Sequence, residues 1–124
     1  MQLGMIGLGR MGAFIQEDLA KIGISARIVS YDWGTYLKRQ REQPPDMDFF
    51  QLGWTGDNGD PDNFLAVLFD GLADPAVRTQ WHNEAYHKLM QDGKQTIDQN
   101  KRAEIYRKAQ ALMYEECPVI PIAH

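Results

Sequence analysis

The sequence lacks three features that would each point to a particular class of protein. No run of apolar residues approaches the roughly 18 that cross a bilayer, so we expect no membrane span. Lysine and arginine total 13 against 17 aspartates and glutamates, and the net charge of −4 leaves no basic stripe for nucleic acid. The single cysteine, Cys117, cannot form an internal disulfide, so cysteine usage leaves the redox compartment open. The first apolar residues lack a basic leader and a cleavage site, so we expect a cytoplasmic product.

What the sequence does contain is enough apolar material for one folded domain. Its 124 residues are 44% hydrophobic and 24% charged, which is typical of an ordinary globular protein. This length is too short for a cofactor domain followed by a substrate domain. We therefore predict that residues 1–124 form a single domain.

Strand and helix patterns alternate along this domain. Short apolar or β-branched runs predict strands at residues 2–7, 25–31, 47–54 and 119–123. Helical periodicity predicts helices at residues 10–22, 35–42, 83–90 (with its end near Gly93) and 98–116, and a short helix capped by Asp62. The alternation predicts an α/β fold of three layers, in which a mainly parallel sheet of about four or five strands is covered by helices. Its first strand, helix and strand would be a Rossmann-like βαβ unit, and such sheets bind ligands at the carboxyl ends of their strands.

The first stretch expected at that edge is a glycine-rich turn. Gly7, Gly9 and Gly12 fit the pattern G-x-G-x-x-G, which allows a tight turn, a close approach to a pyrophosphate and close helix packing. Asp32 directly follows the second predicted strand, 20 residues after Gly12, where a carboxylate would bind the ribose of NAD. The alternative is that the glycines only shape a turn and that Asp32 caps the next helix. Because the second half of a Rossmann fold is missing, we expect no cofactor, with NAD as the alternative.

The opening stretch MQLGMIGLGRMG closely resembles the N-terminus of 6-phosphogluconate dehydrogenases. The resemblance covers only residues 1–13. The substrate-binding and catalytic regions of that family have no counterpart in the rest of the chain. We therefore expect no enzyme activity and no catalytic residue.

The second stretch expected at the edge is the loop GWTGDNGDPDNFL. Trp54 offers a flat apolar surface, and Asp57, Asp60 and Asp62 offer carboxylates. An aromatic ring beside a carboxylate suits a primary ammonium group, through charge-assisted hydrogen bonds and cation–π contact. The alternative is a loop held by Asx turns and helix caps. The spacing does not fit a calcium loop, so we expect no metal.

The remaining chemically active side chains are expected to be structural. His82 and His87 lie five residues apart, which does not place them on one helix face as a metal-binding pair, so we expect surface histidines. Cys117 has no evident catalytic partner and is expected to pack at a helix end.

Residues 14–124 resemble the periplasmic dipeptide-binding proteins, which are the solute receptors of peptide-importing ABC transporters. The resemblance rests on the stretches FIQEDLAKIGISARIVSYDWGTYLKRQREQ, DMDFFQLGWTGDNGDPDNFLAVLF and NKRAEIYRKAQALMYEECPVIPIAH. In that family the acid of a W-x-x-D motif pairs with the α-amino group of the ligand. The resemblance gives this role to Asp57 and makes Trp54 part of the cleft wall.

Members of that family are several times longer and hold the ligand between two lobes, whereas these residues supply one lobe. We therefore predict a chimeric or engineered stand-alone domain without native catalytic activity, in which dehydrogenase-like residues 1–13 precede a receptor lobe of residues 14–124. Two alternatives remain, namely weak binding of a dipeptide amine at Trp54 and Asp57, and residual dinucleotide binding at the glycine turn. Exposed lobe surface also predicts self-association into a homo-oligomer.

Overall fold

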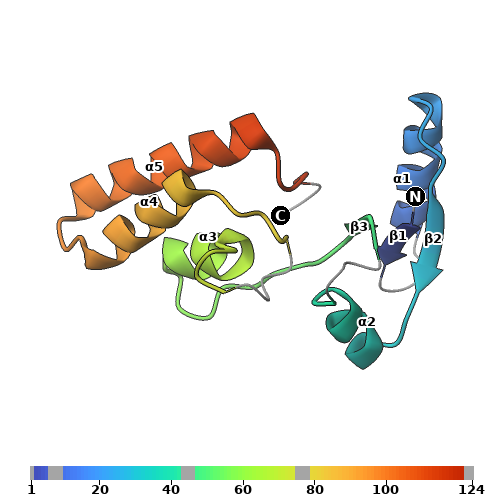
Figure 1. Cartoon of the computed structure of the whole chain (residues 1–124), viewed down its shortest axis with the longest axis horizontal. Helices are drawn as coiled ribbons and strands as arrows, with labels where there is room; N and C mark the ends of the chain where they lie inside the picture. The colour runs from blue at the N-terminus through green and yellow to red at the C-terminus, as the bar shows by residue number, and fades with distance from the viewer. Residues whose placement is uncertain (1, 6–9, 43–46, 75–78, 122–124) are drawn as a thin grey trace. The chain divides into compact units, whose positions relative to one another are not determined.

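The computed structural model describes residues 2–5, 10–42, 47–74 and 79–121 (Figure 1). The chain divides into two compact units, Met1–Trp54 and Thr55–His124. None of the helices in the described part of the chain combines the length and the apolar character needed to cross a bilayer.

The first unit contains a small parallel sheet. β1 (Gln2–Met5) lies between β2 (Arg27–Ser30) and β3 (Phe49–Phe50) and runs parallel to both, so the strand order is β2-β1-β3. α1 (Arg10–Lys21) joins β1 to β2, as parallel neighbours require a crossover, and it contacts β2. α2 (Trp33–Arg39) joins β2 to β3. The predicted βαβ order is therefore present at the start of the chain, while the Rossmann-like character of this unit stays a prediction.

Two side chains form hydrogen bonds that link α1 and α2 to the backbone next to the strands. Gln16 on α1 donates from Nε2 to the carbonyl of Ala26 at 2.7 Å, just before β2 begins. Tyr36 on α2 is fully buried, and its hydroxyl donates to the carbonyl of Gln51, just after β3. Each bond links a helix to the backbone beside a strand, so the sheet and its connecting helices support one another.

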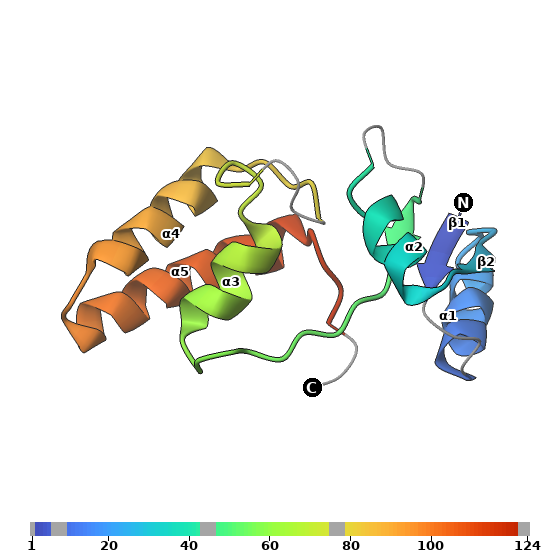
Figure 2. The same ribbon diagram turned by 90° about the horizontal axis from the view of Figure 1, so that it is seen from below.

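The second unit is a cluster of helices. α3 (Pro61–Phe69) packs on α4 (Glu84–Gln95), and α4 lies antiparallel beside α5 (Gln99–Glu116), as Figures 1 and 2 show. Apolar side chains from all three helices form one buried core, which contains Leu65, Ala66, Tyr86, Met90, Tyr106 and Ala109. No strand occurs among the described residues of this unit. The contacts within each unit do not test the three-layer arrangement or the single α/β domain, which stay predictions.

α4 continues through Gly93 to Gln95, slightly beyond the end near Gly93 that the sequence pattern predicts. Gly93 is buried, and a Cβ atom at this position would lie 2.8 Å from Cζ of Tyr106. The glycine thus allows α4 and α5 to approach closely. Packing on Tyr106 outweighs the helix-propensity cost of glycine, which is about 1 kcal/mol.

The third predicted strand is much shorter than expected. The apolar run at residues 47–54 forms only the two-residue β3, which pairs with Leu3 and Gly4 of β1. Directly after β3, the carbonyl of Gln51 accepts the hydroxyl of Tyr36. An alternating apolar pattern reports burial on one face, but a strand also needs a neighbour to pair with, and the sequence does not show that neighbour.

The last predicted strand is also wrong where it is described. Residues 119–121 are irregular, and residues 122–123 lie outside the described part. α5 ends at Glu116, its C-cap Cys117 adopts the left-handed conformation with φ 50°, and Pro118 follows. Cys117 is exposed, so its predicted packing role is wrong too. Three strands are therefore found among the described residues, rather than the predicted four or five.

Candidate functional site

Residues 55–60 form an irregular loop before α3, and short polar contacts hold its shape. The N–H of Asp57 donates to Oδ1 of Asn63 at 3.0 Å, and Nδ2 of Asn63 lies 3.4 Å from Oδ2 of Asp57. Oδ1 of Asn58 accepts the N–H of Asp60 at 3.0 Å, which is an Asx-type contact. The prediction of a loop held by Asx turns and helix caps is confirmed.

Asp57 presents its carboxylate to solvent. Its side chain is exposed, and Asn63 contacts Oδ2 only. Among the described residues, Oδ1 of Asp57 has no hydrogen-bond or ion-pair partner. This oxygen is therefore open to a donor from outside the chain, and a cation would form the strongest bond with it.

Trp54 belongs to the first unit and Asp57 to the second. The indole of Trp54 is partly exposed, with 36% of the residue accessible to solvent. Joint action of the two residues on one ligand stays a prediction.

Asp60, rather than Asp62, is the N-cap of α3, which corrects the sequence-based assignment. Oδ1 of Asp60 accepts the N–H of Asp62 at 2.9 Å, and Pro61 occupies the first helical position. Proline suits that position because its missing N–H has no partner within the helix anyway. The Asp-Pro pair was the signal in the sequence that identifies Asp60 as the cap.

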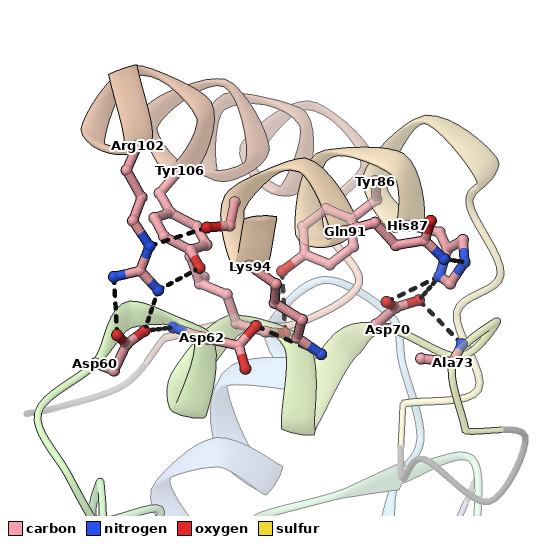
Figure 3. Close-up of polar contacts among 12 residues, drawn as sticks. Asp60, Asp62, Asp70, Ala73, Tyr86, His87, Gln91, Lys94, Arg102 and Tyr106 are labelled. Atoms are coloured by element: carbon pink, nitrogen blue, oxygen red, sulfur yellow. Dashed lines mark hydrogen bonds and ion pairs between the residues drawn. The ribbon is translucent and has the colours of Figure 1, made fainter. Parts of the chain in front are cut away.

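Arg102 on α5 binds Asp60 through both arms of its guanidinium group (Figure 3). Nη1 lies 2.8 Å from Oδ2 of Asp60, and Nη2 lies 2.7 Å from Oδ1. Nη2 also donates to the hydroxyl of Tyr106 at 3.1 Å, and Nε donates to the carbonyl of Gly93 at 2.9 Å. The hydrogen bonds from Arg102, with a further bond from the N–H of Asp62, hold the pKa of Asp60 below its usual range.

The three carboxylates of the predicted ammonium site therefore differ in their surroundings. Asp60 is paired with Arg102, and Asp62 lies 3.6 Å from Nζ of Lys94. Asp57 forms no ion pair with any described residue. The sequence could not reveal these pairings, because 42 positions separate Asp60 from Arg102 and nothing local links them.

Asp32 is the N-cap of α2, as the alternative interpretation predicts. Its Oδ1 accepts the N–H of Thr35 at 3.0 Å, and the pKa of Asp32 is lowered by hydrogen bonds from the side chain and then the backbone of Thr35. Gly12 is buried near the start of α1. Gly7 and Gly9 lie outside the described residues, so the predicted dinucleotide site is described only in part and stays a prediction.

A second polar pair lies at the C-terminal end of α3, and no pattern in the sequence predicted it. Nδ1 of His87 lies 2.9 Å from both carboxylate oxygens of Asp70, whose side chain is only 2% exposed (Figure 3). Asp70 also accepts the N–H of Ala73 at 3.2 Å, and Nε2 of His87 lies 2.6 Å from Nε2 of Gln91. The surface position predicted for His87 is thus wrong, whereas His82 is exposed as predicted. In the described part of the chain, no three histidine, cysteine, aspartate or glutamate residues gather to hold a metal ion.

Comparison with known proteins identifies the family of this chain. Residues 7–75 match the bacterial extracellular solute-binding proteins, family 5 (middle region). The chain is 50% identical over 116 residues to a dipeptide-binding protein of Pseudomonas aeruginosa, an alignment that covers 92% of this chain and 21% of that protein. It is 44% identical over 117 residues to the dipeptide-binding protein of Escherichia coli, covering 93% of this chain and 22% of that protein. The chain therefore spans about a fifth of the length of the curated relatives it matches.

The fold agrees with this assignment. The crystal structure of a dipeptide-binding protein from Pseudoalteromonas sp. SM9913, in complex with Met-Leu, matches with a TM-score of 0.89 and 33% identity over 100% of this chain and 26% of that one. These relatives are binding proteins and not enzymes, in agreement with the expectation that the chain has no enzyme activity. Since the family match spans more than half of the residues, the chain belongs to the bacterial extracellular solute-binding proteins of family 5.

Proposed function

We propose that this chain supplies the part of a peptide receptor that binds the ligand's amino terminus. The carboxylate of Asp57 would accept hydrogen bonds from the α-ammonium group of the ligand, and the indole of Trp54 would provide an apolar wall of the binding site. The observation that carries the proposal is the exposed carboxylate of Asp57, whose Oδ1 has no hydrogen-bond or ion-pair partner among the described residues. The relatives from Pseudomonas aeruginosa and Escherichia coli are dipeptide-binding proteins, which supports a peptide as the ligand class.

The surroundings of Asp57 suit a cationic ligand. Asn63 contacts Oδ2 and the backbone N–H of Asp57, which limits rotation of the carboxylate and leaves Oδ1 for the ammonium group. Arg102 forms an ion pair with Asp60, and Lys94 forms one with Asp62. Both cations therefore have carboxylate partners other than Asp57. A hydrogen bond between an ammonium group and a carboxylate is about twice as strong as a neutral one.

The proposal predicts that Asp57→Asn weakens dipeptide binding by about tenfold or more, because the amide keeps the shape of the carboxylate but loses its charge. Titration of the ¹⁵N-labelled chain with Ala-Phe, followed by NMR chemical shifts, measures the dissociation constant. Because the chain spans 21% of the relative's length and binding sites normally bury most of a ligand, we expect a dissociation constant of about millimolar.

Two controls accompany that titration. Asp92→Asn removes another exposed aspartate, on α4, and should leave the affinity unchanged. N-acetyl-Ala-Phe lacks the ammonium group and should bind to the unaltered chain more weakly than the free dipeptide does. The Asp57→Asn variant should bind the two peptides with equal affinity. Equal affinities for the free and the acetylated peptide would contradict the proposal.

Dinucleotide binding is a second candidate function. The parallel order β1–α1–β2, with Asp32 shortly after β2, favours it. The engagement of Asp32 by Thr35 weighs against it, so we propose that the chain works without a cofactor. NAD at millimolar concentration is expected to leave the melting temperature unchanged, whereas a ligand at 100 times its dissociation constant would add about 2.7 kcal/mol to the stability. A rise in the melting temperature that Asp32→Ala removes would establish the dinucleotide function instead.

The chimeric or engineered origin of a stand-alone domain belongs with these proposals. The resemblance of residues 1–13 to a dehydrogenase supports it, but the family match covers residues 7–75 and so includes residues 7–13 of that stretch. The cytoplasmic location and the self-association inferred from the sequence also stay predictions.

A further inference from the structure

The loop that carries Asp57 is anchored to α3 at three points. The backbone and side chain of Asp57 contact Asn63, as described above. Gly56 packs against the ring of Phe64 so closely that a Cβ atom would collide with it. At the end of the loop, Asp60 caps the helix. The position of Asp57 therefore depends on how the first turn of α3 is held.

Arg102 holds that first turn from a different helix. Its guanidinium group donates hydrogen bonds to both carboxylate oxygens of Asp60 (Figure 3). Its Nε also donates to the carbonyl of Gly93 on α4, and its Nη2 to the hydroxyl of Tyr106 on α5. The Arg102 side chain is only 18% exposed, and its ring contact with Tyr106, at 5.1 Å, limits its movement further. One side chain thus ties the end of the loop to α4 and α5.

We propose that Arg102 is the positioning residue of the ammonium site, acting on Asp57 through Asp60 and the first turn of α3. This inference rests on the proposed function. Arg102 itself would not touch the ligand, because its donors are directed to Asp60, Gly93 and Tyr106.

The planar fork of arginine is essential to this role. It binds the two carboxylate oxygens in one plane, which fixes the orientation of Asp60 as well as its distance. Oδ1 of Asp60 also accepts a hydrogen bond from the N–H of Asp62. Fixing the Asp60 carboxylate therefore also fixes the backbone at the start of α3. A lysine would keep the charge without the fork, and we therefore expect Arg102→Lys to restore the function only in part.

The test compares Arg102→Gln with Arg107→Gln, which removes an exposed arginine from the same helix. The measured quantity is the ratio of the affinities for Ala-Phe and N-acetyl-Ala-Phe. Since this ratio reports the ammonium contact alone, a general loss of folded protein does not change it. We expect Arg102→Gln to lower the ratio about fivefold, Arg102→Lys to lower it less and Arg107→Gln to leave it unchanged. In the Asp57→Asn background, Arg102→Gln should have no further effect, because both changes act on one contact.

A measurement without ligand separates the inference from the proposed function. Amide hydrogen exchange at Asp57 and Asp62 reports their bonds to Asn63 and Asp60, and the amide of Tyr86, bonded to the side chain of Asn83, serves as a comparison. Arg102→Gln should accelerate exchange at Asp57 and Asp62 but not at Tyr86.

The outcomes are distinct. If the unaltered chain does not prefer the free dipeptide, the proposed function fails, and with it the ligand role of Arg102, whatever the exchange rates show. If it prefers the free dipeptide but Arg102→Gln changes neither the ratio nor the exchange at Asp57, the proposed function stands and the positioning role is overturned. Should Arg102→Gln fail to fold, Arg102→Lys and Asp60→Asn carry the same two measurements.

Discussion

Replacing Tyr86 by alanine is expected to lower the free energy of unfolding by about 3–5 kcal/mol. Tyr86 is 1% exposed, and its ring centroid lies 4.7 Å from that of Trp81. Its hydroxyl donates to the carbonyl of Leu65 at 3.1 Å and lies 3.2 Å from Sδ of Met113. The truncation would leave a cavity between α3, α4 and α5 and an unsatisfied carbonyl on α3, and both are costly.

Two variants divide this effect into its parts. Tyr86→Phe keeps the ring and removes only the hydroxyl, so it should cost about 1 kcal/mol. Tyr114→Ala removes a tyrosine that is 88% exposed on α5 and should change the stability by less than about 0.5 kcal/mol. Urea denaturation followed by far-UV circular dichroism measures all three. Equal losses for Tyr86→Ala and Tyr114→Ala would mean that Tyr86 is not in the core.

Gly71→Ala is expected to destabilise the chain by about 1–3 kcal/mol, although most compatible glycine-to-alanine changes stabilise a protein. Gly71 is buried just after α3, and a Cβ atom there would lie 2.5 Å from the carbonyl oxygen of Trp81 and 3.2 Å from Cδ2 of His82. The carbonyl is backbone and cannot rotate away as a side chain could. Trp81 is also fixed by its indole N–H, which donates to Glu116 at 2.9 Å.

Gly53→Ala is the matched control for this second prediction. A Cβ atom at Gly53 would have nothing within 4 Å, and the residue is not in a positive-φ conformation. Its substitution should be neutral or stabilise the chain by up to about 1 kcal/mol, because alanine has fewer unfolded conformations to lose. Thermal denaturation of both variants checks the difference. A Gly71→Ala protein as stable as Gly53→Ala would show that Trp81 can move without cost.

The elements that local chemistry determines are those that the sequence predicted well. The helix predicted at residues 10–22 is observed at Arg10–Lys21, with Gly23 at φ 82° where a glycine ends a helix. The longest helix, predicted at residues 98–116, is observed at Gln99–Glu116 with Asp98 as its N-cap. Caps, glycines and apolar periodicity lie within a few residues of the structure that they specify, so a single sequence reveals them.

Features that depend on distant partners were not predictable in the same way. The extent of β3 depends on its pairing with β1, and the half-buried state of His87 depends on Asp70, 17 positions away. The candidate site shows the same division. The aspartates of the loop were recognised, but only the structure separates the paired Asp60 from the open carboxylate of Asp57.

The central position of β1 in the sheet has a consequence for the order in which the chain folds. Leu3 pairs with Phe49, so the whole intervening segment must be brought back before that parallel contact forms, and the entropy of closing such a loop is lost first. α4 and α5 are joined only by residues 96–98, and their packing closes a much shorter loop. Topology therefore favours early formation of the α4–α5 hairpin and late completion of the β1–β3 pairing, which leaves the edge of β1 unpaired longest and open to pairing with other chains.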